Sequence, residues 1–321
     1  MRAIVQLRYG PPESVELRDV PKPKPKAGEV LVRVMASSVN AADLEILSGS
    51  ILVRMAAPRR PASRIAGSDV AGVVERVGPG VTGPAVGDEV MGDLSEHGYG
   101  AFAEYAAAPA EALCRKPARL SFDQAAAVPS AAWVAIKGMR EVEPGSRVLI
   151  NGAGGSMGTF AVQMAAARGA HITGVDSAAK LELIRELGAT ETIDYATADP
   201  TQGDERYDLV LDVFARRSVR EWRRVLTPTG AYRMVGGSTW RILSGFAVGT
   251  LMSRTSDQQL GMLLGWPHSR RDMDEVNELF ESGAIRSVID RTYRLEEAAA
   301  AMRRVEDGLA HGNVVITVGP A

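Results

Sequence analysis

Cysteine is almost absent from this chain of 321 residues, which contains only Cys114. A single cysteine excludes a disulfide within the chain. It also removes the usual basis of a zinc site, which is a set of cysteines and histidines at short spacing. The four histidines, at 97, 171, 268 and 311, are scattered one by one. We therefore expect no bound metal, and we interpret Cys114 as a small buried residue.

An excess of charge and a long apolar run are absent as well. Lysine and arginine number 37 against 39 for aspartate and glutamate, so the formal net charge is −2. This balance indicates neither a nucleic-acid partner nor a membrane surface. The longest uncharged apolar run, 242–252, is far shorter than the ~20 residues that span a bilayer. The first residues meet charge and proline too early for a signal peptide, so we expect a soluble, cytoplasmic protein.

Two sequence patterns follow one another along the chain. Valine-rich runs joined by glycine turns fill the first third, as in 67–93, and are typical of a small barrel or curled sheet. From about Asp123, short apolar runs alternate with helix-period stretches. This alternation predicts an α/β fold with a parallel sheet that helices cover on both faces. The tail returns to helices and one strand, which we expect to rejoin the first domain.

The sequence therefore predicts two domains. The first is β-rich and made of 1–122 and 267–321, and the second is the α/β segment 123–266. Within the second domain we expect strands at 147–152, 171–176, 190–195, 207–213, 230–237 and 259–266. We expect helices at 157–169, 180–188 and 219–226.

Side chains almost disappear where the first of these strands meets its helix, in VLINGAGGSMGTF (148–160). The turn matches the pattern G-x-G-x-x-G with alanine in the first place. In this pattern the second glycine, here Gly155, lets the backbone approach a pyrophosphate, and the third, Gly158, lets the helix pack closely. Free amides at the helix N-terminus would hold the phosphate oxygens. We predict dinucleotide binding, rather than an empty turn, through Ala153, Gly154, Gly155, Ser156, Met157 and Gly158.

An acidic residue, Asp176, closes the second strand of this segment. A carboxylate there can accept hydrogen bonds from both ribose hydroxyls of NAD(H) and would repel the 2′-phosphate of NADP(H). Ser177 and Lys180 follow, and they could instead hold that phosphate, although Lys180 is explained equally well as a solvated lysine of the first helical turn. The sequence leaves NADH and NADPH as alternatives.

Segments from end to end resemble the zinc-free, quinone oxidoreductase-like branch of the medium-chain dehydrogenase/reductase superfamily. They are SSVNAADLEILSG (37–49), GSDVAGVVERVGPGV (67–81), GAFAEYAAAP (100–109), AAAVPSAAWVA (125–135), NGAGGSMGTFAVQMA (151–165), LGATETIDY (187–195), YDLVLDV (207–213) and GNVVITV (312–318). The resemblance implies a GroES-like β-rich domain with an inserted Rossmann domain, whose parallel sheet is doubly wound. It also implies metal-free hydride transfer from NAD(P)H to a quinone or an α,β-unsaturated carbonyl compound.

The resemblance further implies an active site in the cleft between the domains, with the segment around Asn40 under the nicotinamide. Asn313 stands where relatives usually have a lysine, and we include it among the cofactor contacts. Many relatives carry a tyrosine at the position of Glu45, and an ionised glutamate cannot donate a hydrogen bond. The backbone implied to flank the nicotinamide belongs to Val213, Phe214, Val235 and Gly236.

Several residues near Asn40 have two readings. Asn40 contacts the substrate or cofactor, or it satisfies the backbone of a turn. Asp43 caps the helix that follows it or has a role in the site. Glu45 relays a proton if burial raises its pKa, or it is a solvated helix residue. Tyr99 lies with His97 on a glycine-flanked loop, which we interpret as a surface loop rather than one that reaches the site.

Three functions fit these observations, and the first is preferred. It is a zinc-independent NAD(P)H-dependent quinone or enone oxidoreductase. The second is a zinc-independent alcohol dehydrogenase, and the third is a cofactor-binding regulator without catalysis. The last predicted strand, 259–266, is an edge that relatives pair across a two-fold axis, so we expect a homodimer. The apolar segment 238–254 could cover the substrate or pack on the second subunit.

Overall fold

The structure is a computed structural model that describes residues 1–237, 240–241, 256–263 and 268–318. Most of 238–254, and the end of the predicted strand 259–266, lie outside these described residues. The chain forms two compact units, Met1–Ala131 with Ser287–Ala321 and Ala132–Arg286. The domain boundaries expected from the sequence, at 122/123 and 266/267, stay a prediction.

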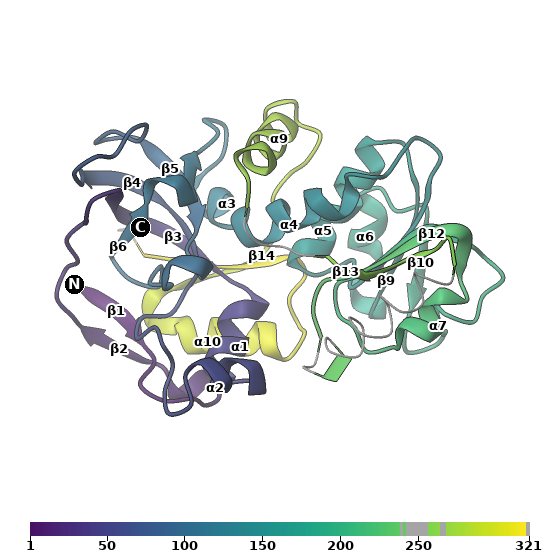
Figure 1. The fold of residues 1–321 in the computed structure, drawn as a ribbon, viewed down its shortest axis with the longest axis horizontal. Helices are drawn as coiled ribbons and strands as arrows, with labels where there is room; N and C mark the ends of the chain where they lie inside the picture. The colour runs from purple at the N-terminus through teal and green to yellow at the C-terminus, as the bar shows by residue number, and fades with distance from the viewer. Residues whose placement is uncertain (238–239, 242–255, 264–267, 319–321) are drawn as a thin grey trace. The chain divides into compact units, whose positions relative to one another are not determined.

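The first unit is built on a β-sheet to which both ends of the chain contribute (Figure 1). Its strands are β3 (Glu29–Val39), β4 (Asp69–Val77), β5 (Glu89–Asp93), β6 (Tyr105–Pro109), β7 (Leu113–Arg115), β14 (Ile289–Arg294) and β15 (Asn313–Thr317). The order is β14-β15-β3-β4-β5-β7, and β6 also pairs with β3. A separate antiparallel pair consists of β1 (Arg2–Val5) and β2 (Glu16–Asp19).

The tail of the chain completes this sheet. β15 runs antiparallel to β3, with Val314 opposite Val39 and Thr317 opposite Ala36. The neighbouring β14 is parallel to β15, and helix α10 (Ala298–Glu306) connects the two strands. The strands joined by tight turns form the β-rich, GroES-like domain that the sequence predicts.

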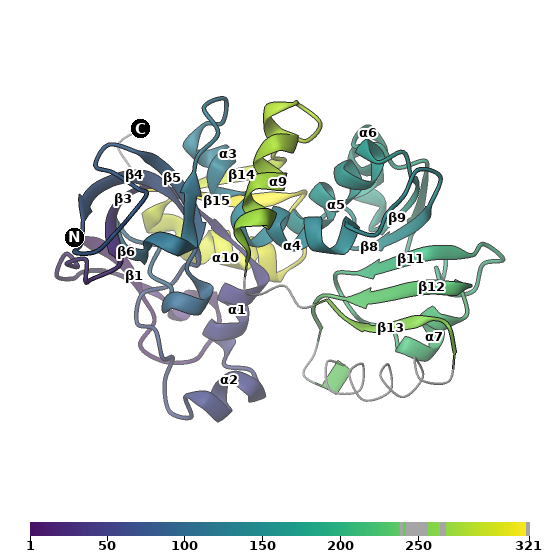
Figure 2. The same cartoon turned by 45° about the horizontal axis from the view of Figure 1, so that its top comes forward.

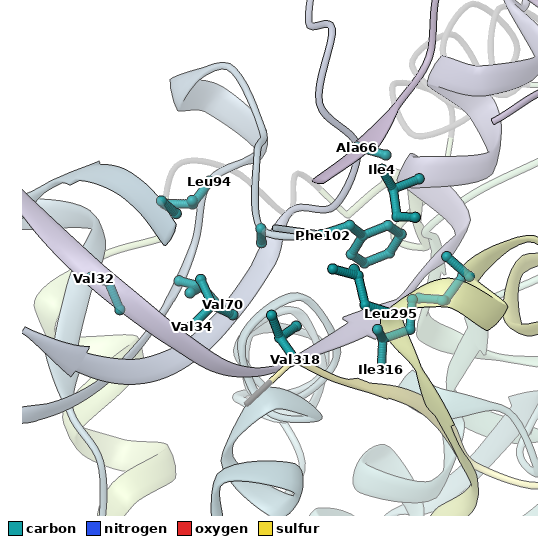
Figure 3. Close-up of a cluster of buried hydrophobic side chains, with 14 of the residues drawn as sticks. Ile4, Val32, Val34, Ala66, Val70, Leu94, Phe102, Leu295, Ile316 and Val318 are labelled. Carbon is teal, nitrogen blue, oxygen red and sulfur yellow. The ribbon is translucent and has the colours of Figure 1, made fainter. Parts of the chain in front are cut away.

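The core of the first unit lies where these segments meet (Figure 3). Phe102 is 0% exposed, and its ring is packed with Ile4 from β1 and Leu295 from the tail. The loop before Phe102 approaches Gly67 so closely that a Cβ there would lie 2.3 Å from the Phe102 ring. Gly67 has φ +91°, which also favours glycine. Burial of this aromatic ring therefore fixes the path of the loop beside β4.

The second unit contains the parallel sheet. Its strands are β8 (Arg147–Asn151), β9 (His171–Asp176), β10 (Glu191–Asp194), β11 (Tyr207–Asp212), β12 (Leu226–Met234) and β13 (Gln259–Met262). They lie in the order β10-β9-β8-β11-β12-β13, and every pair is parallel. This is the Rossmann order, in which the direction of chain progression reverses between β8 and β11. The predicted doubly wound fold is confirmed.

Helices cover both faces of this sheet, with α5 and α6 on one face and α7 on the other (Figure 2). They are α5 (Ser156–Ala167), α6 (Leu181–Glu186) and α7 (Val219–Arg223). The helix predicted over 219–226 is shorter than expected. The chain leaves the helix after Arg223 because Leu226 pairs with Tyr207 and starts β12.

The remaining helices are α1 (Ala41–Ser48), α2 (Ile51–Ala56), α3 (Phe122–Ala126), α4 (Pro129–Met139) and α9 (Arg270–Glu281). In the second unit α9 is tied to α4 because Arg140, just beyond the end of α4, donates to Asp272 at 2.7 Å. Among the described residues, no helix is both long and apolar enough to cross a membrane.

Phe102→Ala is expected to lower the free energy of unfolding by about 3–5 kcal/mol, because a buried aromatic side chain is replaced by a cavity. Urea denaturation followed by circular dichroism measures the change. Val86→Ala is the control, since Val86 is 67% exposed in the same unit. A loss at Phe102 no larger than that of the control contradicts the assignment of Phe102 to the core.

Candidate active site

The glycine turn between β8 and α5 presents bare backbone at the carboxyl end of the sheet. Gly155 is the N-cap of α5 and offers no side chain to the first amides of the helix. Those amides have no partner inside a helix. The carbonyl of Val175 on β9 holds the start of the turn, since it accepts from Gly152 N at 2.9 Å and from Ala153 N at 3.2 Å. The turn is therefore fixed by its neighbours while the helix N-terminus stays available.

The two later glycines of the pattern have different roles. A Cβ on Gly158 would lie 2.1 Å from the carbonyl oxygen of Gly152, so only glycine allows α5 to pack this closely. A Cβ on Gly155 would meet only that same oxygen, at 3.5 Å. The space beside Gly155 is open, which is what the approach of a diphosphate requires. The residues of the turn therefore fit a dinucleotide.

Asp176 and Lys180 lie beside this turn and are both buried, at 7% exposure each. The Asp176 carboxylate accepts from Gly154 N at 2.9 Å and from Ser177 N at 2.8 Å. Lys180 Nζ lies 3.6 Å from the same carboxylate. The reading of Lys180 as a solvated lysine is wrong, because its stem packs against Gly154 and its ammonium faces Asp176. Asp176 has a structural role here besides any contact with a ribose.

The predicted nicotinamide-flanking residues gather at the same edge of the sheet. Val213 N donates to Asn151 O at 3.0 Å, and the space beside Gly152 is bordered by Val213 and Phe214. Ala215 N donates to Gly236 O at 3.2 Å, next to Val235. The ends of β8, β11 and β12 thus bring together the residues expected from the second unit. Their contact with a cofactor stays a prediction.

A buried carboxylate connects the strands at this edge of the sheet. Asp212, the last residue of β11, is 0% exposed. Its two oxygens accept from Asn151 Nδ2 at 2.7 Å and from Tyr232 Oη at 2.9 Å. Burial raises the pKa of Asp212, and these two hydrogen bonds oppose the rise. The pair of donors fixes the ends of three neighbouring strands relative to one another.

In the first unit, Asn40 caps helix α1. Its Oδ1 accepts from Ala42 N at 2.9 Å and from Asp43 N at 3.3 Å, and its own N–H donates to the Asp43 carboxylate. The reading of Asp43 as the N-cap is therefore wrong. Asp43 is the third residue of the helix and completes a capping box. Of the two readings of Asn40, the structure shows the backbone contacts, and a contact with substrate stays a prediction.

The amide nitrogen of Asn40 is engaged as well. Asn40 Nδ2 donates to Ser68 Oγ at 2.6 Å and lies 3.4 Å from the carboxylate of Asp69. The same carboxylate accepts from Ser38 Oγ at 2.6 Å. Ser130, at the N-terminus of α4, donates to it from Oγ at 2.7 Å and from N at 2.9 Å. Asp69 thus joins β3, β4, the cap of α1 and the start of α4.

Burial raises the pKa of Asp69 to about 7, and the charge of Asp93 on the neighbouring strand adds to the rise. Hydrogen bonds from Ser38 and Ser130 oppose it. Burial likewise raises the pKa of Asp43 well above its usual value, helped by the charges of Asp69 and Asp93. Three carboxyl groups therefore share a low-dielectric region next to Asn40.

Two further predicted residues of this unit have local partners. Glu45 is exposed on α1, and its carboxylate accepts from Ser50 Oγ at 2.8 Å. Asn313 is 2% exposed, and both its backbone N and its Nδ2 donate to Val288 O, at 2.8 and 3.1 Å. The catalytic role of Glu45 and the cofactor contact of Asn313 stay predictions.

Tyr99 has the most unusual backbone of this region. Among the described residues it is the one non-glycine residue with positive φ, at 61°. This conformation costs an L-residue about 1–2 kcal/mol. The side chain is partly buried, and the charges of Asp43, Asp93 and Glu45 act on its hydroxyl. His97 is exposed, so the loop lies at the surface as expected from the sequence, with Tyr99 partly buried at its end.

Sequence reasoning did not identify Asp69, Ser130 and Tyr99 as parts of one polar region. They come from β4, from α4 and from a loop, and no local motif connects them. Cys114 is buried, as expected. Within the part of the chain that the structure describes, no three His, Cys, Asp or Glu side chains are grouped to hold a metal.

Comparisons with known proteins agree with this geometry. Residues 26–118 match the sequence model of the alcohol dehydrogenase GroES-like domain, and residues 187–316 match that of the zinc-binding dehydrogenases. The chain is 31% identical to a mitochondrial NAD(P)H oxidoreductase of Mus musculus, over 90% of this chain and 82% of the relative. The chain belongs to the medium-chain dehydrogenase/reductase superfamily, in its quinone oxidoreductase-like branch.

Two other members of this superfamily show the range of similarity. A zinc-type alcohol dehydrogenase-like protein of Schizosaccharomyces pombe is 32% identical, over 94% of this chain and 93% of the relative. The solved structure of the quinone oxidoreductase from Coxiella burnetii aligns with a TM-score of 0.89 at 27% identity, covering 99% of each chain. The chain is therefore an oxidoreductase of a family whose members use NAD(P)(H).

Asp69→Asn is expected to change how stability depends on pH. The usual pKa of an aspartate, 3.8, is raised to about 7 in the folded chain, so the folded state keeps a proton that the unfolded state releases. The contribution of Asp69 to the free energy of unfolding therefore decreases as pH rises from about 4 to about 7. Urea denaturation across this range should show a smaller decrease in Asp69→Asn than in the wild type. Asp19→Asn, an exposed carboxylate of the same unit, is the control, and equal slopes for all three proteins contradict the prediction.

Proposed function

We propose that this chain is a zinc-independent reductase that transfers hydride from NADH or NADPH to a quinone or an α,β-unsaturated carbonyl compound. The observation that carries the proposal is the open space beside Gly155 at the N-terminus of α5. We call this turn, with the first amides of α5, the backbone cradle. The family membership supports the same chemistry. When bound, the reduced nicotinamide supplies the hydride, and the protein supplies orientation and polarisation of the acceptor.

The second unit provides the binding contacts. The first amides of α5 donate to the diphosphate, where the helix dipole favours negative charge. Asp176 holds the Gly154 amide and so keeps the turn in its open form. Val213, Phe214, Val235 and Gly236 provide the backbone wall for the nicotinamide. The neighbouring pair Asp176 and Lys180 places both charges near the adenosine end, so either form of the cofactor is a candidate.

Zinc independence rests on the supply of ligands. The chain has one cysteine, and the structure gives Cys114 to the strand β7, where it pairs with Met91 on β5. The polar groups that contact Asn40, including Ser68 and Asp69, are amides, hydroxyls and carboxylates. None of them is a thiolate or an imidazole, which are the usual zinc ligands. In this proposal a protein hydrogen-bond donor polarises the carbonyl oxygen in place of a metal ion.

The wild type is expected to oxidise NADH or NADPH when 1,4-benzoquinone or 2-cyclohexen-1-one is added, with no effect of a chelator. The decrease in nicotinamide absorbance in a stopped-flow instrument measures the rate. Turnover of simple alcohols with the oxidised cofactor, and none with these two acceptors, would select the alcohol dehydrogenase instead. Cofactor binding without any turnover would select the regulator.

The same experiment includes Gly155→Val, which places a branched side chain in the cradle. This variant is expected to fold normally and to lose cofactor affinity by more than about tenfold. Gly203→Val is the matched control, because Gly203 lies in an exposed loop of the same unit, where a Cβ would meet only Glu205 N, at 3.9 Å. Fluorescence titration with both reduced cofactors gives the dissociation constants. Unchanged affinity in Gly155→Val contradicts the role of the turn.

We also propose a homodimer that pairs β13 of one subunit with β13 of the next. This strand is the edge of the parallel sheet and is paired only with β12 within the described residues. An unpaired edge exposes a row of backbone donors and acceptors. Sedimentation velocity at micromolar concentration is expected to show a dimer, and a monomer alone counts against this interface.

A further inference from the structure

The loop that carries Tyr99 is anchored to the strand segment next to Asn40. Leu94 N donates to Ser68 O at 2.8 Å, and Tyr99 N donates to Leu94 O at 2.9 Å. On the other side, Gly100 N donates to Gly67 O at 2.8 Å. The side chain of Ser68 accepts from Asn40. The backbone of Tyr99 is therefore held in a defined place relative to the cap of α1.

This anchoring keeps the strained conformation of Tyr99 in place. Its neighbours Gly98 and Gly100 take φ of 93° and 112°, which glycine adopts freely, whereas tyrosine does not. Residues that keep such a conformation are concentrated at functional sites, where the surrounding structure imposes it. A glycine at position 99 would avoid the conformational cost of the positive φ. The presence of a tyrosine therefore indicates that its side chain has a role.

The hydroxyl of Tyr99 has no hydrogen-bond partner among the described residues. Burial, followed by the charges of Asp43, Asp93 and Glu45, raises its pKa, so the group stays protonated and remains a donor. Asp43 and Glu45 belong to α1, and Asp93 is the last residue of β5. Ser95 on the same loop also has an unpartnered hydroxyl, but that Oγ is fully buried.

The other polar groups of this region are already engaged. Both hydrogens of the Asn40 amide face Ser68, Asp69 and Ser130. Glu45 carries a carboxylate, which accepts from Ser50. Neither residue offers a free hydrogen to a substrate.

We propose that the hydroxyl of Tyr99 donates the hydrogen bond that binds and polarises the carbonyl oxygen of the quinone or enone. This inference rests on the proposed function and names the residue that performs one part of it. As hydride brings two electrons to the conjugated acceptor, negative charge develops on the carbonyl oxygen and the nicotinamide is oxidised. Tyr99 stabilises that charge, and the reduced product then takes a proton from water.

Tyr99→Phe tests the proposal because it keeps the ring and removes only the hydroxyl. With 1,4-benzoquinone and 2-cyclohexen-1-one, kcat/KM is expected to fall by about 100-fold or more, the effect of removing one donor to a developing oxyanion. Dissociation constants for NADH and NADPH, and the thermal denaturation curve, should match the wild type. The deuterium isotope effect with 4-deuterated cofactor should not decrease, because hydride transfer becomes slower.

A second measurement does not depend on turnover. In a complex of the enzyme, oxidised cofactor and 2-cyclohexen-1-one, the infrared carbonyl stretch is expected at lower frequency in the wild type than in Tyr99→Phe. Tyr105→Phe is the matched control, since Tyr105 lies on β6 of the same unit, where the ammonium of Lys22 covers its ring at 3.5 Å. It should behave as the wild type in both experiments.

The outcomes separate the two proposals. If the wild type reduces the acceptors and Tyr99→Phe reduces them equally fast with an unchanged carbonyl stretch, the role of Tyr99 is overturned and the reductase assignment stands. If the wild type reduces neither acceptor, both proposals are overturned. A rate loss confined to Tyr99→Phe, together with the shifted carbonyl stretch, supports both.

Discussion

The contact between Gly158 and the carbonyl of Gly152 is the constraint on which the second unit depends. No side chain fits there, because a Cβ would lie 2.1 Å from the oxygen. Only this close approach brings the N-terminus of α5 to the end of β8, where its first amides point out of the sheet edge. Asp176 then holds Gly154 from the next strand, and Asp212 joins the ends of β8, β11 and β12. The backbone cradle, and the position of the strand ends beside it, therefore depend on the close packing of Gly158 against Gly152.

The first unit differs in this respect. Its main polar feature is a group of buried carboxyl groups, whereas that of the second unit is open backbone. Asp69 receives hydrogen bonds from Ser38, Asn40 and Ser130, which come from three different elements. A carboxylate without such donors would be strongly destabilised at this depth. Because these side chains already donate to Asp69, they have no free donor for a ligand. The polar centre fixes the cap of α1 and the start of α4, and it leaves few groups free to meet a ligand.

The sequence predicts the parts of the fold that local patterns determine. Alternating strands and helices, the glycine turn and the acidic end of β9 are all contiguous signals, and they predict a parallel sheet covered on both faces and a dinucleotide-binding turn, whereas the Rossmann domain was implied by the family resemblance. Burial of Lys180 was not predictable, because it depends on Gly154 from a neighbouring element. The sequence offers Asp43 as a possible cap of α1, whereas the structure has Asn40 there, since both residue types cap helices and only geometry separates them. Asp69 and Tyr99 gain their surroundings from tertiary contacts alone.

These two arrangements together support the proposed role of a loop residue, Tyr99. The metal-free reductase proposed above needs a neutral donor that stays protonated and has no hydrogen-bond acceptor within its own protein. Asn40 meets the first condition and fails the second, and the carboxyl group of Glu45 is already engaged as the acceptor of a hydrogen bond from Ser50. The phenol of Tyr99 meets both, since burial and nearby carboxylates raise its pKa while its hydroxyl keeps no partner in the described structure. In the proposed role of Tyr99, the positive φ of 61° is the conformational cost of holding that hydroxyl in place.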